Sequence, residues 1–315
     1  MIMMKKTVAV LLAVLCCFGI LSGCTEKPEN QNDKISIVCT VAPVYDWLCE
    51  IVGEKTELFE ITCLSGSGDL HSFQPTAQDM SKILSCDLFV TIGGETEEWT
   101  QKLKPSEKTK RLELIKLVPD SELICMSDGH HDHEGDGHTA DEHIWLSLKL
   151  AQRAVSGISE ALCDIDAANG VIYQKNEAEY IERLKKLDKQ FADEVNKHSE
   201  RVLVFADRFP FGYMMQDYEI SYYAAFSGCS TDADASFETV AKLCDAIERH
   251  DKHTVIELEN SNQSITSALD SALKNIDITA VVMDSCQTVG KNELEEFDYI
   301  EVMTKNLEAM SKALE

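Results

Sequence analysis

Residues 170–198 read GVIYQKNEAEYIERLKKLDKQFADEVNKH, and this uninterrupted stretch decides the fold. Neither glycine nor proline occurs between Val171 and Phe209. Apolar side chains recur on one helical face at Ile172, Tyr180, Leu184, Leu187, Phe191 and Val195. At a rise of ~1.5 Å per residue, about 28 residues span roughly 42 Å, which is enough to cross a two-lobed molecule. We therefore expect one long helix within residues 164–200 that links two lobes and packs against both.

On the N-terminal side of this helix, short apolar runs rich in β-branched residues alternate with helical patterns. The expected strands are Ile35–Thr40, Leu58–Leu64, Leu88–Ile92 and Leu123–Met126. The expected helices are Val44–Val52, Thr76–Leu84, Thr96–Leu103 and Ala140–Cys163. Such alternation is typical of a parallel sheet covered by helices. Residues 35–163 are therefore predicted to form an N-terminal α/β lobe.

The same alternation restarts after the long helix. The expected strands are Val202–Ala206, Tyr222–Phe226, Thr254–Leu258 and Ile278–Met283. The expected helices are one ending near Asp217, then Ser236–Arg249, Ser264–Lys274 and Asp298–Leu314. Residues 201–315 thus form a second lobe. The predicted fold class is α/β, with two lobes, each a mainly parallel sheet flanked by helices, joined by one long linking helix.

The first residues have the pattern of an export signal. Residues 1–23 combine two lysines, an apolar core too short for a comfortable membrane span and a small-residue cleavage zone. The tetrad Leu21-Ser22-Gly23-Cys24 matches a bacterial lipobox, in which Cys24 is acylated and becomes the mature N-terminus. Residues 24–34 are polar and read as a lipidated tether. We expect a protein that is lipid-anchored at the cell membrane, on its extracytoplasmic face.

Composition argues against two kinds of site. The formal net charge of −26 would repel nucleic-acid backbones, and no basic aromatic patch offsets it. The chain has 12 cysteines, but those beyond the leader are scattered and contain no CxxC pair. Most of them lie in apolar runs, where a thiol packs as a small hydrophobic side chain. A zinc cluster built from cysteines is therefore not expected.

Residues 128–148 read DGHHDHEGDGHTADEHIWLSL and contain five of the chain's nine histidines. Within residues 128–138, His130, His131, His133 and His138 alternate with acidic residues and glycines, with nothing apolar to bury. This part reads as a solvated loop. Clustered imidazoles with nearby carboxylates favour capture of zinc-like ions, so we predict an accessory metal loop.

Two other histidines have a different setting. His143 stands directly before the apolar residues Ile144–Leu146, where its ring can face inward and be held rigidly. His71 lies in GSGDLHSFQPTAQDM, a loop between a strand and a helix. Ligands of open α/β sheets gather at the carboxyl ends of the strands, which is where this loop falls. Both histidines belong to the N-terminal lobe and are candidate metal ligands.

The order of these motifs resembles that of a known family. A lipobox, DLHSFQPTAQDM, LFVTIGGETEEW, a His-rich loop, EHIWLSLKLA, a long helix and VLVFADRFPFGYM follow one another. Together they are similar to the zinc/manganese solute-binding lipoproteins of bacterial ABC importers, the cluster A-I metal-binding family. The resemblance covers essentially the whole mature chain and implies a monomeric receptor that hands its ion to an ABC transporter permease.

In that family two histidines of the first lobe and two residues of the second bind one ion. The resemblance therefore implies His71 and His143 from the first lobe. In the second lobe this chain has Ala206 where a histidine is usual, so the neighbouring Asp207 is a candidate, unless it pairs with Arg208 or caps a helix. Asp284 is implied as the fourth ligand. Cys286, Gln287 and Glu259 are fallback candidates near it.

Two imidazoles and two carboxylates suit zinc, and with added oxygen ligands they suit manganese. The His-rich loop favours zinc, because within the family such loops resemble those of zinc importers. An extracytoplasmic zinc hydrolase is a less favoured alternative, since HExxH and GxSxG are both missing from the sequence. An adhesin-like surface lipoprotein is another. We therefore expect a zinc receptor without catalytic activity.

Overall fold

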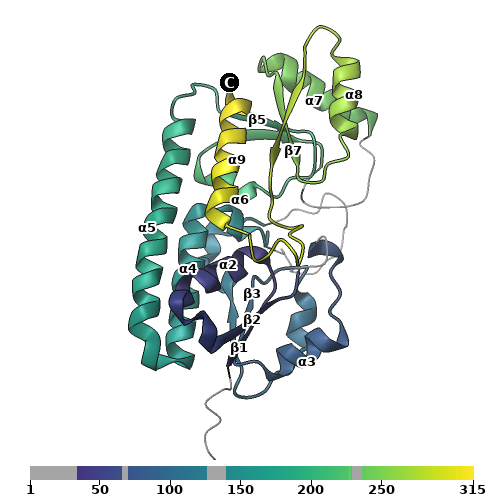
Figure 1. Ribbon diagram of the computed structural model, residues 1–315. Helices are drawn as coiled ribbons and strands as arrows, with labels where there is room; N and C mark the ends of the chain where they lie inside the picture. Colours follow the sequence, from purple (N-terminus) through teal and green to yellow (C-terminus); the bar gives the residue numbers. More distant parts are fainter. Residues whose placement is uncertain (1–33, 66–69, 126–139, 227, 229–235) are drawn as a thin grey trace, which may run out of the picture. The chain divides into compact units, whose positions relative to one another are not determined.

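The computed structural model describes residues 34–65, 70–125, 140–226, 228 and 236–315. The predicted leader, the lipidation site at Cys24 and nearly all of the tether lie outside the described residues. So does the whole of loop 128–138 with its four histidines. Residues Ile35–Glu315 belong to one unit in which two sheets and the helices around them pack together (Figure 1). In the part of the chain described, no helix is both long and apolar enough to cross a membrane.

The first lobe is built on a four-stranded sheet in which every pairing is parallel. In spatial order the strands are β2 (Phe59–Cys63), β1 (Ile35–Cys39), β3 (Leu88–Thr91) and β4 (Lys110–Glu113). All four residues of β3 are buried, whereas β4 at the edge is half-exposed. A parallel sheet needs helical crossovers, and these cover its faces.

The helices of this lobe are α2 (Ala42–Val52), α3 (Ala77–Ser85) and α4 (Leu148–Ile165). Helix α3 begins where the sequence predicts, because Thr76 and Asp79 form a reciprocal capping box. Because α3 follows the loop that carries His71, this cap fixes the end of that loop.

The strand predicted at Leu123–Met126 is wrong. Leu123 and Ile124 adopt no regular structure, and Cys125 makes only an isolated antiparallel bridge with Ala140. The fourth strand is β4, with the sequence KRLE, which pairs with β3. An edge strand buries only part of its surface, so two charged side chains at its start are tolerated. Its low apolar content concealed it in the sequence.

Three other predicted elements are also corrected, one in its type of helix and two in their boundaries. Thr96–Leu103 contains a short 3₁₀ helix, Glu98–Lys102, instead of an α-helix. The helix predicted over Ala140–Cys163 starts only at Leu148, because the Ser147 hydroxyl caps it by accepting from the Leu150 N–H at 3.0 Å. The strand predicted at Tyr222–Phe226 is one to two residues earlier, at Ser221–Ala224.

The long linking helix is confirmed as α5 (Gly170–Val195), which has 26 residues. Its apolar face packs on α2 and α4 of the first lobe and on the C-terminal helix α9 (Tyr299–Leu314) of the second (Figure 1). The Tyr180 hydroxyl also donates to the buried Asp46 carboxylate of α2 over 2.9 Å. One continuous helix bonded to both lobes restricts their relative motion more than a flexible hinge would.

The second lobe repeats the plan of the first. Its sheet has the order β6 (Ser221–Ala224), β5 (Val202–Phe205), β7 (Thr254–Leu258) and β8 (Thr279–Met283), again all parallel. Helices α6 (Gly212–Asp217), α7 (Phe237–Arg249), α8 (Ser264–Ala272) and α9 complete it. The predicted fold class, two parallel-sheet α/β lobes joined by a long helix, is therefore confirmed.

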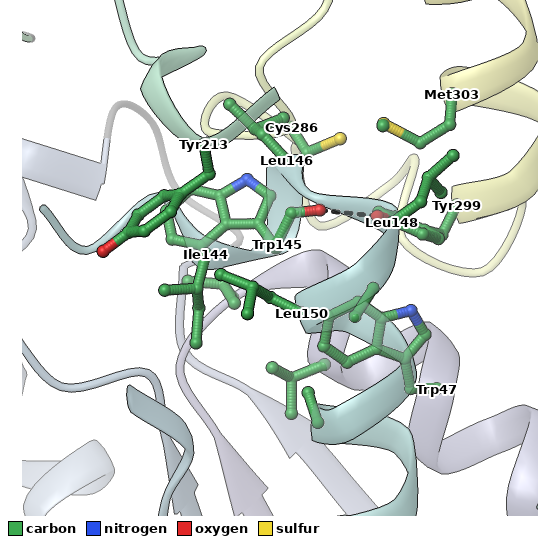
Figure 2. Close-up of a cluster of buried hydrophobic side chains, with 14 of the residues drawn as sticks. Trp47, Ile144, Trp145, Leu146, Leu148, Leu150, Tyr213, Cys286, Tyr299 and Met303 are labelled. Carbon is green, nitrogen blue, oxygen red and sulfur yellow. Dashed lines mark hydrogen bonds between the residues drawn. The ribbon is translucent and has the colours of Figure 1, made fainter. Parts of the chain in front are cut away.

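An apolar cluster joins the lobes around Trp145, which is fully buried (Figure 2). Tyr299 of α9 donates its hydroxyl to the Trp145 carbonyl oxygen at 2.5 Å. The Tyr299 ring also meets Trp47 of α2 edge-on, with centroids 5.2 Å apart. Cys286 and Met303 from the second lobe lie in the same cluster. The segment that carries His143 is thus held by both lobes.

Candidate metal centre

His143 is a buried residue on the first lobe, 1% exposed, at the start of the 3₁₀ turn Ile144–Leu146. Asp141 fixes its orientation in two ways. One carboxylate oxygen lies 2.6 Å from the ring Nδ1 and accepts the His143 backbone N–H at 3.0 Å. A carboxylate on one ring nitrogen sets the tautomer and leaves Nε2 as the nitrogen suited to a metal.

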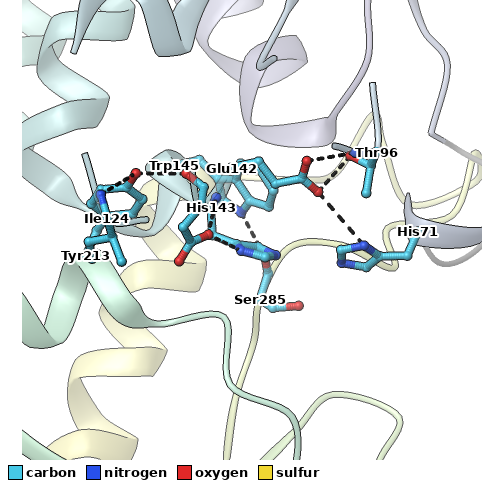
Figure 3. A network of polar contacts seen from close by, with 9 residues as sticks. His71, Thr96, Ile124, Glu142, His143, Trp145, Tyr213 and Ser285 are labelled. Carbon is cyan, nitrogen blue, oxygen red and sulfur yellow. Dashed lines mark hydrogen bonds and ion pairs between the residues drawn. The ribbon is translucent and has the colours of Figure 1, made fainter. Parts of the chain in front are cut away.

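His71 comes from a different part of the same lobe, the 3₁₀ turn Leu70–Ser72 that follows β2. The centroid of its ring lies 5.7 Å from that of His143 (Figure 3). The structure therefore brings together the two histidines that the sequence pairs, although they are far apart in the chain.

Glu142 completes this group and is not among the ligands predicted from the sequence. Its carboxylate is 3% exposed and accepts from Thr96 twice, from the backbone N–H at 3.0 Å and the hydroxyl at 2.7 Å. One of its oxygens lies 3.9 Å from Nδ1 of His71. Among the residues that the structure describes, His71, Glu142 and His143 form the one group able to share an ion, with ligand atoms all within 4.8 Å of one another.

A glycine pair explains how a carboxylate fits there. Gly94 has φ +109°, and a Cβ added to it would lie 2.6 Å from the Glu142 side chain. The neighbouring Gly93 donates its N–H to Glu97 at 2.8 Å. A side chain at position 94 would therefore displace Glu142. The Gly-Gly turn of LFVTIGGETEEW was the available signal for this contact.

The field at the group is negative. Glu97 is 3% exposed, and its pKa is raised to about 7, mainly by burial and in part by the nearby Glu142 charge. Buried carboxylates repel one another, and a cation between or beside them relieves that cost. The polar surroundings of the two histidines therefore favour a positively charged ligand.

The described residues on either side of positions 126–139 are held together close to Asp141. Cys125 and Ala140, on either side of residues 126–139, pair with each other. Tyr213 of α6 accepts from the Ile124 N–H at 3.3 Å and donates to the Asp141 carbonyl oxygen at 2.8 Å. The two residues that flank positions 126–139 are therefore paired, and Ala140 is three residues before His143 in the sequence.

Asp207, the first candidate of the second lobe, engages backbone groups. One of its oxygens accepts from the Arg208 N–H at 2.8 Å and the other from the Leu258 N–H at 3.3 Å. Its carboxylate also lies 3.8 Å from the Arg208 guanidinium. The neighbouring Ala206 is 2% exposed and packs in the apolar core of its own lobe. Through these contacts Asp207, which follows β5, is bonded to Leu258, the last residue of β7, as a structural carboxylate would be.

Asp284, the second candidate, also holds a turn. Its carboxylate accepts from the Cys286 N–H at 2.7 Å. Its backbone N–H donates to the side-chain oxygen of Asn306, and its backbone carbonyl oxygen accepts from the side-chain amide nitrogen of Asn306. Burial raises its pKa. Together with Glu259 and Glu293 it lines a pocket of about 370 Å³, which does not include the paired histidines. Asp207 and Asp284 are thus both outside the histidine group as the structure stands.

The three fallback candidates also belong to the second lobe and have different surroundings. Cys286 is 3% exposed and lies in the apolar cluster (Figure 2). Glu259 accepts from the Ser285 backbone N–H at 2.8 Å and from its hydroxyl at 2.5 Å. Gln287 is 5% exposed. The Ser285 carbonyl oxygen accepts the Trp145 indole N–H at 2.9 Å, so this loop of the second lobe reaches the neighbourhood of His143 (Figure 3).

Comparison with known proteins extends over both lobes. A family model described as zinc-uptake complex component A, periplasmic (ZnuA), matches residues 37–313. The zinc-binding lipoprotein AdcA of Streptococcus pneumoniae R6 is 29% identical over 314 residues, 98% of this chain. The chain spans only 61% of that relative's length. The high-affinity zinc uptake system protein ZnuA of Bacillus subtilis is 26% identical over 315 residues, covering 96% of this chain and 97% of that protein.

A solved structure gives the same result. The Zn(II)-bound ZnuA-like domain of Streptococcus pneumoniae AdcA superposes with a TM-score of 0.71 at 25% identity, over 89% of this chain and 99% of that domain. The resemblance inferred from the sequence motifs is confirmed. The chain belongs to the ZnuA family, the periplasmic component A of zinc-uptake complexes.

Proposed function

We propose that this protein is an extracytoplasmic receptor that binds zinc and delivers it to the permease of an ABC importer, without catalysing a reaction. The observation that carries the proposal is the group of His71, Glu142 and His143, in which Glu142 and His143 are buried and His71 is partly buried. Family membership and the zinc named for its relatives point to the same cargo. Manganese is the alternative cargo for the same fold.

Two imidazole nitrogens and a carboxylate oxygen are a zinc-type ligand set. Bond lengths of ~2.0–2.1 Å in a tetrahedron place ligand atoms roughly 3.3 Å apart. The three groups lie within 4.8 Å of one another, so a shift of about an ångström would close them around an ion. We propose that Asp141 acts on the metal through His143 by holding its Nδ1.

The second-lobe ligands stay predictions. Asp207 and Asp284 were implied by the family pattern, and the backbone contacts of both carboxylates favour structural roles. Gln287 lies two residues after Ser285, whose carbonyl oxygen accepts from the Trp145 indole N–H close to His143. Water or one of these three side chains would supply the fourth position of a zinc site.

The remaining parts of the proposal rest on the sequence. Cys24 would carry the lipid anchor on the extracytoplasmic face, and the receptor would act as a monomer. Loop 128–138 would capture ions weakly and pass them to the group of His71, Glu142 and His143. Its flanking residues Cys125 and Ala140 are paired next to Asp141, which supports a short path.

Calorimetric titration of the metal-stripped mature chain with zinc, then manganese, tests the proposal. We expect one tight zinc site, and a loss of at least ~100-fold in affinity for H71A, E142Q or H143A, as removal of a ligand costs several kcal/mol. H253A is the control, because His253 is 61% exposed and far in sequence from the group. Unchanged affinity in all three variants would refute the site. Tight binding of manganese alone would keep the site and change the cargo.

A further inference from the structure

Two cysteines lie side by side on neighbouring strands of the first sheet. Cys39 ends β1 and Cys63 ends β2, and the parallel register pairs them directly. Neighbouring strands lie ~4.7–4.9 Å apart, within the ~4.4–6.8 Å range of Cα separations that a disulfide accepts. Both side chains pack in the same apolar core, so they point to the same side of the sheet. Both are free thiols in the structure.

The two thiols have unequal surroundings. Cys39 is fully buried, and burial raises its pKa. Cys63 is 7% exposed, and its pKa is lowered, first by a hydrogen bond from Cys39. The Ser65 hydroxyl, 3.5 Å from the Cys63 sulfur, and the Lys291 ammonium also stabilise its thiolate. Such asymmetry separates an attacking thiol from a resolving one.

We propose that Cys39 and Cys63 are a reversible disulfide-forming site, oxidised by small-molecule disulfides through exchange, with Cys63 as the attacking thiol. The Cys63 thiolate attacks one sulfur of the small disulfide, which forms a mixed disulfide and expels one thiolate. Cys39 then gives its proton to that thiolate and attacks the Cys63 sulfur, which expels the second thiolate. Two protein thiols and one small disulfide thus become one protein disulfide and two small thiols.

The position of the pair gives the crosslink a structural consequence. Beyond the cysteines, β1 and β2 remain joined, because the Leu64 N–H donates to the Cys39 carbonyl at 2.9 Å and the Ser65 N–H to the Thr40 carbonyl at 3.2 Å. The chain after Ser65 leads to His71. The disulfide would therefore fix the strand end from which the His71 loop starts. The proposal rests on the sheet register and does not depend on zinc binding.

Peptide mapping after oxidation tests this site. The reduced mature chain is incubated with glutathione disulfide at neutral pH, quenched by alkylation and digested. We expect a peptide linking Cys39 to Cys63 that disappears on reduction with dithiothreitol. C86S is the matched control, because Cys86 is also buried, 3% exposed, but lies in a separate core cluster. It should form the crosslink as the unmodified chain does.

Two single variants test the order of attack. C39S lacks the resolving thiol and should accumulate glutathione on Cys63. C63S should carry at least ten-fold less glutathione on Cys39. Cys49 of α2 is the competing partner, since its charge raises the pKa of Cys39 and the charge of Cys63 raises the pKa of Cys49. Absence of the Cys39–Cys63 peptide, a dominant link to Cys49, or equal adducts in the two variants would overturn the proposal.

Discussion

The indole N–H of Trp145 donates to the carbonyl oxygen of Ser285 over 2.9 Å, which joins the two lobes two residues from His143. Tyr299 bonds the Trp145 carbonyl from α9, so this residue is held from two directions by the second lobe. Because Trp145 and the metal-site histidine share one short turn, interlobe contact and metal affinity should change together.

Replacing Trp145 with Phe tests that coupling. The variant keeps an aromatic ring but leaves the buried Ser285 carbonyl without its donor, which should cost ~1–3 kcal/mol of unfolding free energy. Zinc affinity should fall as well. Urea unfolding and zinc titration measure the two effects. W99F is the control, because Trp99 lies in a separate cluster with Phe73. Equal losses in W145F and W99F would show that the bond to Ser285 is unimportant.

Gly94→Ala should disturb the site through Glu142. The backbone at φ +109° is strained for any residue with a Cβ, and the added methyl would meet the Glu142 side chain. We expect a stability loss of ~1–3 kcal/mol and weaker zinc binding. Thermal unfolding and zinc titration provide the measurements.

Gly170→Ala is the matched control for that substitution. Gly170 has ordinary helical φ −51°, and its added Cβ would make only a 3.4 Å contact with the Cys163 sulfur. G170A should therefore leave zinc affinity unchanged. If G94A binds zinc as tightly as G170A does, the position of Glu142 does not matter for the metal.

Asp46 makes the stability of the fold depend on pH. Burial raises its pKa to about 7, although the hydrogen bond from Tyr180 lowers it in part. In the unfolded chain this carboxyl titrates at ~3.9. The folded state therefore binds more protons between these two values, and the free energy of unfolding falls as pH rises through that window.

Asp46→Asn should remove this loss, because Asn still accepts from the Tyr180 hydroxyl but cannot ionise. A difference of about three pKa units at ~1.36 kcal/mol each predicts that D46N is more stable at pH 8 by up to ~4 kcal/mol. The gain should vanish near pH 4. Chemical denaturation across this pH range measures it, with exposed Asp193→Asn of α5 as control. A gain that is the same at pH 4 and pH 8 would contradict the assignment.

Deleting residues 128–138 should separate capture from tight binding. Cys125 and Ala140 are bridged, and the three residues left between them can close a short hairpin connection. We expect one tight zinc ion to remain and only weaker ions to be lost. Equilibrium dialysis with metal counting distinguishes the two classes. Loss of the tight ion would mean that the loop itself supplies a ligand of the main site.

The fold followed from the sequence wherever apolar periodicity was strong. The face from Ile172 to Val195 predicted α5, and buried runs such as that of β3 predicted the sheets. The errors fell where burial is partial. Lys110–Glu113 pairs through its backbone while its charged side chains are exposed or only partly buried, and no periodicity reveals such an edge strand.

The sequence predicted residues of the metal site only where the residue type itself, histidine, is typical of metal ligands. His71 and His143 stood out as histidines at the ends of loops, and the structure places them together. Glu142 looked like one more acidic residue, since its role depends on the space left by Gly94 and on donors from Thr96. Asp207 accepts from backbone N–H groups, and one of them belongs to a strand far away in the sequence. The residues around Asp207 in the chain therefore do not predict its contacts.

X-ray absorption at the zinc edge, on the mature chain loaded with one equivalent of zinc, tests the central claim most directly. We predict nitrogen and oxygen ligands at ~2.0–2.1 Å, with the multiple-scattering pattern of two imidazoles. H143A should lose one imidazole contribution, and E142Q should keep both. A shell of sulfur at ~2.3 Å, or an unchanged imidazole count in H143A, would contradict a zinc site built on His71, Glu142 and His143.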